Sequence, residues 1–556
     1  MLSHEEAIAK VTAPGSRFEI ATRAVGGREQ AVYVNVPRSL RELFATCRDR
    51  GDSVFLVFED ERWTFDRFMA EVDALAAALV GDLGVRHGDR VGIAMRNIPE
   101  WIVGFAAATS VGAISVSLNG WWTADELDFA LGDSTPSVLL ADIERAERGA
   151  ASCTRLGIQL VVARAGDAVL PDGARRWEDV VVPGAPMPDV EVDAEDDATI
   201  LYTSGTTGHP KGAVSTHGAI IQALAAYGCR SVVARLRSPQ EAEAAAAQPA
   251  AFILIVPLFH VTGCVAVMLS CVLNGIKLVI MAKWDAGKAL DHIEAERVTN
   301  FVGVPTQAWD LVGHPRFAEA DTSSLLSVGG GGAPAPPELV RRVEGSLARG
   351  RPAIGYGMTE TNAYGPQNSG DDYVTHPTST GRWMPILQLA VRDPDGVDLP
   401  VGERGEIWFK GPHLIRGYWN RPEATAETIV DGWLRSGDLG RVDEDGFLYV
   451  EDRAKDMVLR GGENVYSAEV EAAIYEHPAV HEAAVFGIPH ERLGEEVAAA
   501  VVPVVGTTLD PDELAAFVRE RIAGFKVPTR WSVEDEPLPR NAAGKFLKRE
   551  LRERLA

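Results

Sequence analysis

The chain has 556 residues, 46% of them apolar and 24% charged, which is ordinary for a globular protein and enough for several domains. The formal net charge of −25 argues against nucleic acid as a partner and against a basic membrane-binding face, because both depend on lysine and arginine. Five scattered cysteines without metal-ligand spacing, and a start without the regions of a signal peptide, lead us to expect a cytoplasmic protein.

The first part of the chain alternates apolar strands with apolar helices. A helical pattern over residues 68–83 is followed by a turn and a buried strand over 88–94. The rhythm continues with a helix over 100–111 and a strand over 113–118. Strands that alternate with helices in this way form parallel sheets covered by helices, so we predict an α/β fold.

One long apolar stretch needs a membrane check. Residues 253–273 carry no formal charge and are long enough to cross a bilayer. Because Pro257 and His260 interrupt the stretch, we predict instead a buried strand, a loop, a buried helix over 261–273 and a further strand over 277–281. We therefore expect no integral membrane segment.

Two features of this region receive no assigned function. Trp121 and Trp122 follow the strand 113–118, and we expect them to pack in the core, with contact to a substrate or partner as the alternative. Residues 235–251 are of low complexity, and we expect an exposed insertion with a short helix.

A segment rich in glycine and hydroxyl residues stands at the centre of the chain. Residues 201–212 read LYTSGTTGHPKG. Glycines let backbone N–H groups close around an anion, hydroxyls add donors, and Lys211 adds a positive charge suited to phosphate. The segment is not a P-loop, which requires Gly-Lys-Ser/Thr at a helix start, because Pro210 precedes Lys211 and Gly212 follows it. An ordinary polar loop is the alternative.

Two later segments are placed where α/β sheets bind ligands. Residues 257–263 follow a buried strand, and His260 there is either a satisfied core histidine or a group at the ligand-binding edge of the sheet. Residues 329–336, GGGGAPAP, would let a planar ring lie against the backbone. A flexible linker is the alternative, but a strand-like run precedes this segment and a helical pattern follows it.

Four motifs complete the set. Residues 355–361, GYGMTET, supply a hydroxyl for phosphate and a carboxylate of the kind that Mg²⁺ prefers. Asp438, within GWLRSGDLG, is suited to accept two ribose hydroxyls, and an ordinary turn is the alternative. Charged residues 452–456 separate two strand-like runs, as a hairpin turn also would, and Lys545 follows a glycine turn near the end, where a solvated tail is the alternative.

These segments together resemble the adenylate-forming superfamily, which includes acyl-CoA synthetases of the AMP-dependent synthetase and ligase family, peptide-synthetase adenylation domains and firefly-type luciferases. The resemblance covers about residues 63–551, with the motifs in the superfamily's order. It implies a large N-terminal domain (1–452) of parallel-rich sheets covered by helices, with a β-barrel-like subdomain. A hinge (453–456) and a small mobile α+β C-terminal domain (457–556) would follow.

The resemblance also implies a role for each motif residue. Tyr356 would pack on adenine, Thr359 would meet the α-phosphate, and Arg453 would contact ribose or phosphate. Lys455 would be the pivot, and Lys526 would face the phosphates of coenzyme A. The implied catalytic residues are Lys545, Thr203, Lys211, His260 and Glu360, of which Thr203 and Glu360 would hold Mg²⁺. The implied ATP- and coenzyme-A-binding residues are Thr203, Ser204, Gly205, Thr206, Thr207, Gly208, Lys211, Gly331, Gly332, Ala333, Pro334, Gly355, Tyr356, Gly357, Met358, Thr359, Asp438, Arg453, Lys455, Gly461, Gly462, Lys526 and Lys545.

The implied reaction converts a carboxylate with ATP to an acyl-AMP and pyrophosphate, and then transfers the acyl group to the thiol of coenzyme A. Amino-acid-activating members usually carry an aspartate near His260, so we expect an acid other than an amino acid. A hydrophobic acid, above all a fatty acid, is the leading expectation, and aryl and steroid acids are alternatives. Transfer to a carrier-protein thiol, luciferase-like oxygenation and a non-catalytic nucleotide-binding protein are the other readings, and a homodimer is left open.

Overall fold

The computed structural model describes residues 2–203, 210–332, 335–347, 349–453, 456–461, 463–541 and 544–555. Within these residues the chain forms two sheets of eight strands, two smaller sheets and one N-terminal hairpin. The hairpin consists of β1 (Ile20–Val25) and β2 (Arg28–Tyr33), and it follows helix α1 (His4–Val11).

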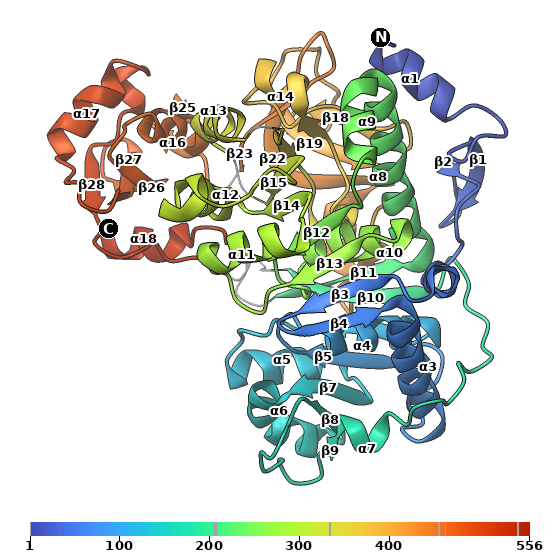
Figure 1. The fold of residues 1–556 in the computed structure, drawn as a ribbon. Coiled ribbons are helices and arrows are strands. Elements are labelled where there is room, and N and C mark those ends of the chain that lie inside the picture. The colour runs from blue at the N-terminus through green and yellow to red at the C-terminus, as the bar shows by residue number, and fades with distance from the viewer. Residues whose placement is uncertain are drawn as a thin grey trace.

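The first large sheet is mainly parallel. Its strands lie in the order β20 (Gly417–Tyr418), β11 (Lys211–Thr216), β10 (Asp197–Thr203), β6 (Ile114–Ser117), β5 (Arg90–Ala94), β7 (Val138–Asp142), β8 (Gln159–Ala163) and β9 (Arg175–Arg176). The segments β5 to β8 are short apolar runs buried on both faces, as strands covered by helices are. Figure 1 shows the helices around this sheet: α3 (Phe65–Gly81), α4 (Pro99–Ser110), α5 (Ala124–Ser134), α6 (Ile143–Leu156) and α7 (Trp177–Val180).

The second large sheet begins and ends with antiparallel strands and is parallel between them. Its order is β17 (Gln367–Ser369), β16 (Arg351–Gly355), β15 (Ser327–Gly331), β14 (Asn300–Gly303), β12 (Ala251–Leu254), β13 (Lys277–Ile280), β3 (Val54–Phe58) and β4 (Glu61–Thr64). Its helices include α2 (Leu40–Ala45), α8 (His217–Arg237), α9 (Pro239–Ala246), α10 (Ser270–Asn274), α11 (Ala286–Glu296), α12 (Pro305–Gly313), α13 (Pro337–Ser346) and α14 (Gly370–Thr375). One continuous apolar core joins α3 and α4 of the first sheet to β13 and α10 of the second.

The helix predicted over residues 261–273 is present but starts in a different form. Residues Thr262–Leu269 form a π-helix, η2, which continues into α10. A Cβ added at Gly263 would lie 2.2 Å from the carbonyl oxygen of Pro257, so the backbone makes a close approach at the start of this helix. Among the described residues, none of the helices has the length and apolar character needed to cross a membrane.

Two further sheets follow in the chain. An antiparallel sheet contains β18 (Gln388–Arg392), β19 (Gly405–Lys410), β22 (Trp433–Val442) and β21 (Ile429–Val430), with β23 (Leu448–Arg453) on β22 and α15 (Pro422–Thr428) beside it. The last sheet contains β25 (Glu463–Val465), β24 (Val458–Arg460), β27 (Gly494–Pro503) and β26 (Val480–His490), with β28 (Arg530–Val533) on β27. Helices α16 (Ser467–Tyr475), α17 (Pro511–Arg519) and α18 (Lys548–Leu555) pack with it.

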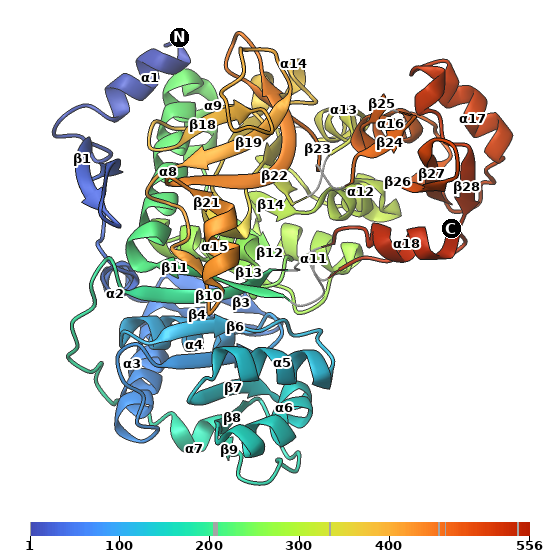
Figure 2. The same cartoon turned by 180° about the vertical axis from the view of Figure 1, so that it is seen from behind.

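The last sheet and its helices form a separate body at one side of the molecule, as both views show (Figures 1 and 2). It has its own apolar clusters, which include Val485 and Val501 on one face and Phe486 and Leu551 on the other. The fold class is therefore confirmed as α/β with a smaller α+β C-terminal domain. The hinge at 453–456 and the mobility of the small domain stay predictions.

Candidate functional site

The glycine-rich segment joins two antiparallel strands of the first sheet. Thr203 at the end of β10 is paired with Lys211 at the start of β11, and Thr203 Oγ1 donates to the carbonyl oxygen of Lys211 at 3.4 Å. The hairpin thus holds a hydroxyl and a lysine side by side at the carboxyl end of β10. The predicted phosphate contacts between these two residues lie outside the described part of the chain. They are Ser204, Gly205, Thr206, Thr207 and Gly208.

Glu360 and Lys211 both contact the same tyrosine, Tyr418. Strand β20 pairs with β11, which brings Tyr418 beside the hairpin. Tyr418 Oη donates to Glu360 Oε1 at 2.7 Å, and Lys211 Nζ lies 5.2 Å from the centroid of the Tyr418 ring. Burial, followed by the negative charge of Glu360, raises the pKa of Tyr418, so the phenol stays protonated and donates to the carboxylate. Tyr418 lies in none of the motifs to which a role is assigned from the sequence.

Tyr356 and Asp438 form the second polar pair. Tyr356 follows β16 of the second large sheet, and Asp438 lies on β22 of the antiparallel sheet. Tyr356 Oη donates to Asp438 Oδ2 at 2.6 Å, and the tyrosine ring packs on Phe409 with 5.7 Å between centroids. The ring of Tyr356 and the carboxylate of Asp438 therefore lie together, as binding of a nucleotide base and its ribose would require. In β23, Arg453 is the strand partner of Asp438.

Glycines between these pairs allow backbone segments to approach closely. A Cβ at Gly330 would lie 1.5 Å from the carbonyl oxygen of Gly303, and one at Gly331 would lie 2.4 Å from that of Gly355. A Cβ at Gly357 would lie 2.2 Å from the carbonyl oxygen of Ala363. These positions admit only glycine unless the neighbouring strand moves. Gly332, with φ of +82°, ends the described part of this segment, and the predicted contacts Ala333 and Pro334 lie outside the described residues.

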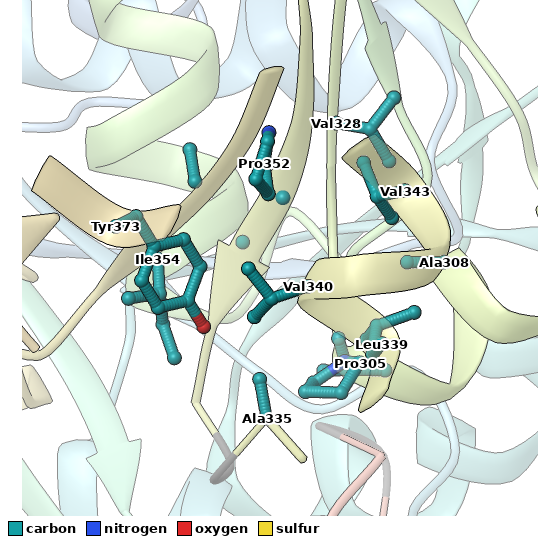
Figure 3. A pocket seen from close by; sticks show the side chains of 14 residues that line it. Pro305, Ala308, Val328, Ala335, Leu339, Val340, Val343, Pro352, Ile354 and Tyr373 are labelled. Carbon is teal, nitrogen blue, oxygen red and sulfur yellow. The ribbon is translucent and has the colours of Figure 1, made fainter. Parts of the chain in front are cut away.

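A small apolar cavity lies between β15, β16 and the helices α12 and α13 (Figure 3). It is lined by valine, leucine, proline and alanine side chains and by Tyr373, and its internal space of about 20 Å³ holds no more than one water. Its lining contains none of the predicted catalytic residues that the structure describes. We therefore assign the site to the polar groups above and not to this cavity.

The next pair of predicted site residues consists of His260 in the large domain and Lys545 in the small domain. Burial, together with a smaller effect of the positive charge of Lys545, lowers the pKa of His260 to about 4, so the imidazole is neutral. The backbone N–H of Thr262 donates to His260 Nδ1 at 3.3 Å. The sequence alone placed these residues in one site only through the family resemblance.

The segment that carries Lys545 also touches the large domain directly. A Cβ at Gly544 would lie 2.9 Å from a methyl group of Val304, and Arg540 Nη1 lies 3.5 Å from Thr306 Oγ1. The backbone N–H of Lys545 is held by Asn541 Oδ1 at 3.0 Å. The segment that carries Lys545 is thus docked on the large domain at Val304 and Thr306.

Within the described residues, no group of three or more His, Cys, Asp or Glu side chains could hold a metal by itself. Glu360, 6% exposed, is a single carboxylate, and Thr203, the strand partner of Lys211, adds a hydroxyl. Mg²⁺ is commonly held by one or two carboxylates together with substrate phosphates. The residues present therefore fit a Mg²⁺ ion that binds with ATP.

The other predicted contacts are distributed more widely. Met358 and Thr359 stand at the start of a 3₁₀ turn, η4 (Thr359–Thr361), after Gly355 and Gly357. Gly461, with φ of +62°, lies in the turn between β24 and β25. Lys526 lies in the small domain and pairs with Glu469 at 2.6 Å. Lys455 and Gly462 lie outside the described residues.

Only one of the two tryptophans packs in the core as expected. Trp122 packs against Tyr202, 5.7 Å between centroids, as expected. For Trp121 the expectation is wrong, because its side chain is 49% exposed. Arg96 lies 5.6 Å above its ring, and Phe259, the neighbour of His260, lies 6.5 Å away.

Comparison with known proteins gives a consistent result. The family model described as AMP-binding enzyme matches residues 43–419, and that described as AMP-binding enzyme C-terminal domain matches residues 469–545. A feruloyl-CoA synthase of Amycolatopsis sp is 39% identical over 492 residues, which are 87% of this chain and 93% of the relative. The long-chain-fatty-acid–CoA ligase FadD13 of Mycobacterium tuberculosis is 34% identical over 89% of this chain and 93% of its own. The crystal structure of ATP-bound MatB from Rhodopseudomonas palustris superposes with a TM-score of 0.79 at 30% identity, over 93% of this chain and 99% of that chain.

Proposed function

The chain belongs to the AMP-binding enzyme family, and we propose from this premise that it is an acyl-CoA synthetase for a hydrophobic carboxylic acid, above all a fatty acid. It is an ATP-dependent acid–CoA ligase. One observation carries the proposal: Lys545 of the small domain lies close enough to His260 of the large domain for its charge to lower the histidine pKa. A lysine at this position can bring together the two anions that must react.

The first half-reaction joins a carboxylate to the α-phosphate of ATP. The carboxylate and the phosphate repel each other, so the site must supply positive charge and fixed orientation. In our proposal Lys545 bridges the carboxylate and the α-phosphate, while Lys211 binds the departing phosphates. Tyr356 packs on the adenine, and Asp438 accepts hydrogen bonds from the ribose hydroxyls.

Glu360 and Thr203 would hold Mg²⁺ in this site. Bound there, Mg²⁺ would neutralise the charge that develops on the pyrophosphate. Tyr418 fixes the Glu360 carboxylate through its hydrogen bond of 2.7 Å. Thr359 lies next to Glu360 in the chain and would meet the α-phosphate.

The second half-reaction transfers the acyl group to coenzyme A. We propose that the small domain turns about residues 453–456, with Lys455 at the pivot, after pyrophosphate has left. Gly461 and Gly462 would then line the path of the thiol, and Lys526 would exchange its pairing with Glu469 for the phosphates of coenzyme A. The thiolate attacks the acyl carbonyl and AMP departs.

The surroundings of His260 support an apolar acid. A neutral imidazole lacks the negative charge that would balance the ammonium group of an amino acid, and its chain neighbours Phe259 and Val261 are buried apolar side chains. The relatives act, by their names, on ferulic acid and on long-chain fatty acids. A fatty acid leads, and an aryl or steroid acid is the alternative.

The test measures pyrophosphate release from ATP and Mg²⁺ across a panel of fatty, aryl, steroid and amino acids, each with and without coenzyme A. We expect a fatty acid to give both pyrophosphate and a thioester. Adenylate without thioester would make a carrier-protein thiol the acceptor and remove the assignments of Gly461, Gly462 and Lys526. Release with amino acids alone would contradict the role given to His260.

We also propose a cytoplasmic location. Each of the five cysteines, all of them within the described residues, is a buried free thiol, as is usual in a reducing compartment. A homodimer stays a prediction that sedimentation velocity can test.

A further inference from the structure

A chain of buried polar contacts joins β23 of the antiparallel sheet to α16 of the small domain. Asp452 on β23 is 8% exposed, and Ser467, the first residue of α16, is 1% exposed. Asp452 Oδ2 accepts a hydrogen bond from the Ser467 backbone N–H at 2.5 Å, and both carboxylate oxygens lie 3.0 Å from Ser467 Oγ. Lys548 Nζ donates to the same Oγ at 2.9 Å and pairs with Glu471 at 2.8 Å.

The lysine of this network keeps its charge. Burial alone would lower the pKa of Lys548, but the negative charges of Glu471, Asp452 and Asp456 outweigh it and raise that pKa. Lys548 therefore stays charged and compensates the buried Asp452 carboxylate. Separating the two sides would take Asp452 away from the Ser467 donors and from the positive charge of Lys548, so these contacts favour the orientation in which the two sides are together.

The two sides of the network belong to different bodies. Asp452 pairs through its backbone with Leu439 of β22, so it is fixed to the large domain. Ser467 and Lys548 lie on α16 and α18, which pack against β26 of the small domain. Lys548 stands three residues after Lys545. A rotation of the small domain about residues 453–456 would thus separate Asp452 from Ser467 at the same time as it removes Lys545 from His260.

We propose that Asp452, Ser467 and Lys548 form a latch that holds the small domain in the orientation in which Lys545 lies beside His260. The latch residues are positioning residues, since none of the three is among the residues assigned to ATP or to the acid. The inference rests on the proposed function, because it assigns the latched orientation to adenylate formation. Breaking the latch shifts the population of orientations toward the one that serves thioester formation.

The first test separates the two half-reactions in the full-length enzyme. Ser467→Ala removes the hydroxyl shared by Asp452 and Lys548 but keeps the backbone N–H. We expect single-turnover pyrophosphate release to fall about tenfold, while thioester formation from supplied acyl-adenylate and coenzyme A stays within about twofold or rises. Asp452→Asn, which keeps the shape but removes the charge, should change the two rates in the same direction. Thermal unfolding identifies any variant that fails to fold.

The matched control is Ser532→Ala. Ser532 Oγ also donates to a carboxylate, Glu534 Oε1 at 2.5 Å, but both residues lie within the small domain. This variant removes the same kind of hydrogen bond without touching the contact between domains. We expect both half-reaction rates to stay at the wild-type value.

A second readout reports the orientation itself. A Cβ at Gly544 would lie 3.5 Å from the Cβ of Val304, within the range of a disulfide. In the double variant Val304→Cys/Gly544→Cys, the rate of disulfide formation therefore measures how often the latched orientation occurs. Gly544 has φ of +79°, where cysteine is strained, so rates are compared only between variants that share this pair. We expect added Ser467→Ala to slow disulfide formation several-fold.

Two results would overturn the latch: an equal loss in both half-reactions, or an unchanged rate of disulfide formation in the Ser467→Ala background. A wild-type enzyme that forms neither adenylate nor thioester with any acid would overturn the proposed function instead. The two failures are therefore distinguishable.

Discussion

Tyr418→Phe tests the metal site through a residue that no motif identified. The substitution removes one oxygen atom and keeps the ring that packs beside Lys211. It deletes the hydrogen bond from Tyr418 Oη to Glu360 Oε1, which is 2.7 Å long and joins a half-buried phenol to a carboxylate that is 6% exposed. Glu360 then keeps its charge but loses a donor that fixes its position.

The expected magnitude follows from the kind of bond that is lost. A hydrogen bond to a charged group contributes about 1.5–3 kcal/mol. If this contribution holds the carboxylate in the geometry that Mg²⁺ needs, its loss weakens the affinity of the site for Mg²⁺ by about 10–100-fold. We therefore expect the Mg²⁺ concentration for half-maximal pyrophosphate release to rise by at least about tenfold.

The assay titrates Mg²⁺ at saturating ATP and acid and records pyrophosphate release. Tyr449→Phe is the matched control, because Tyr449 Oη donates to Asp443 at 3.0 Å in a hairpin away from Lys211 and Glu360. The control should leave the Mg²⁺ dependence unchanged. An unchanged or lower half-maximal concentration in Tyr418→Phe would refute the role given to the tyrosine and weaken the assignment of Glu360 as a metal ligand.

Two further predictions concern the nucleotide pocket and acid stability. Tyr356→Phe removes the hydroxyl that donates to Asp438 at 2.6 Å. We expect KM for ATP to rise roughly tenfold with a smaller change in kcat, as measured by steady-state kinetics. An unchanged KM would contradict the pairing of the base and ribose sites. His413 is fully buried, and burial lowers its pKa to about 3. Below pH 6.5 the His413 side chain binds a proton in the unfolded chain but not in the native protein. The free energy of unfolding therefore falls by about 1.4 kcal/mol for each pH unit by which the pH is lowered. His413→Phe should flatten urea-unfolding stability between pH 6.5 and 4 by that slope, and an identical slope would show that His413 does not contribute.

The local elements of the fold could be predicted because their signals lie in short segments. The alternation of apolar strands and helices up to residue 118 follows from periodicity, and the helix after His260 follows from a long uncharged apolar run. The π-helical start at Thr262–Leu269 could not be predicted in this way. Gly263 in this segment makes a close approach to the carbonyl oxygen of Pro257, and such a contact is a property of the folded backbone.

The site was predictable where one motif carries the chemistry and unpredictable where two distant segments meet. Lys211 and Glu360 each stand in a motif, but Tyr418 joins them only because β20 pairs with β11 across the first sheet. The bond between Tyr356 and Asp438 likewise connects two different sheets. The exposure of Trp121 could not be predicted either, since two adjacent tryptophans in the sequence do not reveal which of them stays exposed.

The most direct test of the account is Lys545→Ala measured in both half-reactions. Lys545 lies beside His260, and we assign to it only the joining of carboxylate and α-phosphate. We expect pyrophosphate release from ATP and acid to be lost, while acyl-adenylate supplied to the variant is still converted with coenzyme A to the thioester. Pyrophosphate release at the wild-type rate, or loss of both half-reactions in a variant that unfolds at the wild-type temperature, would contradict this account.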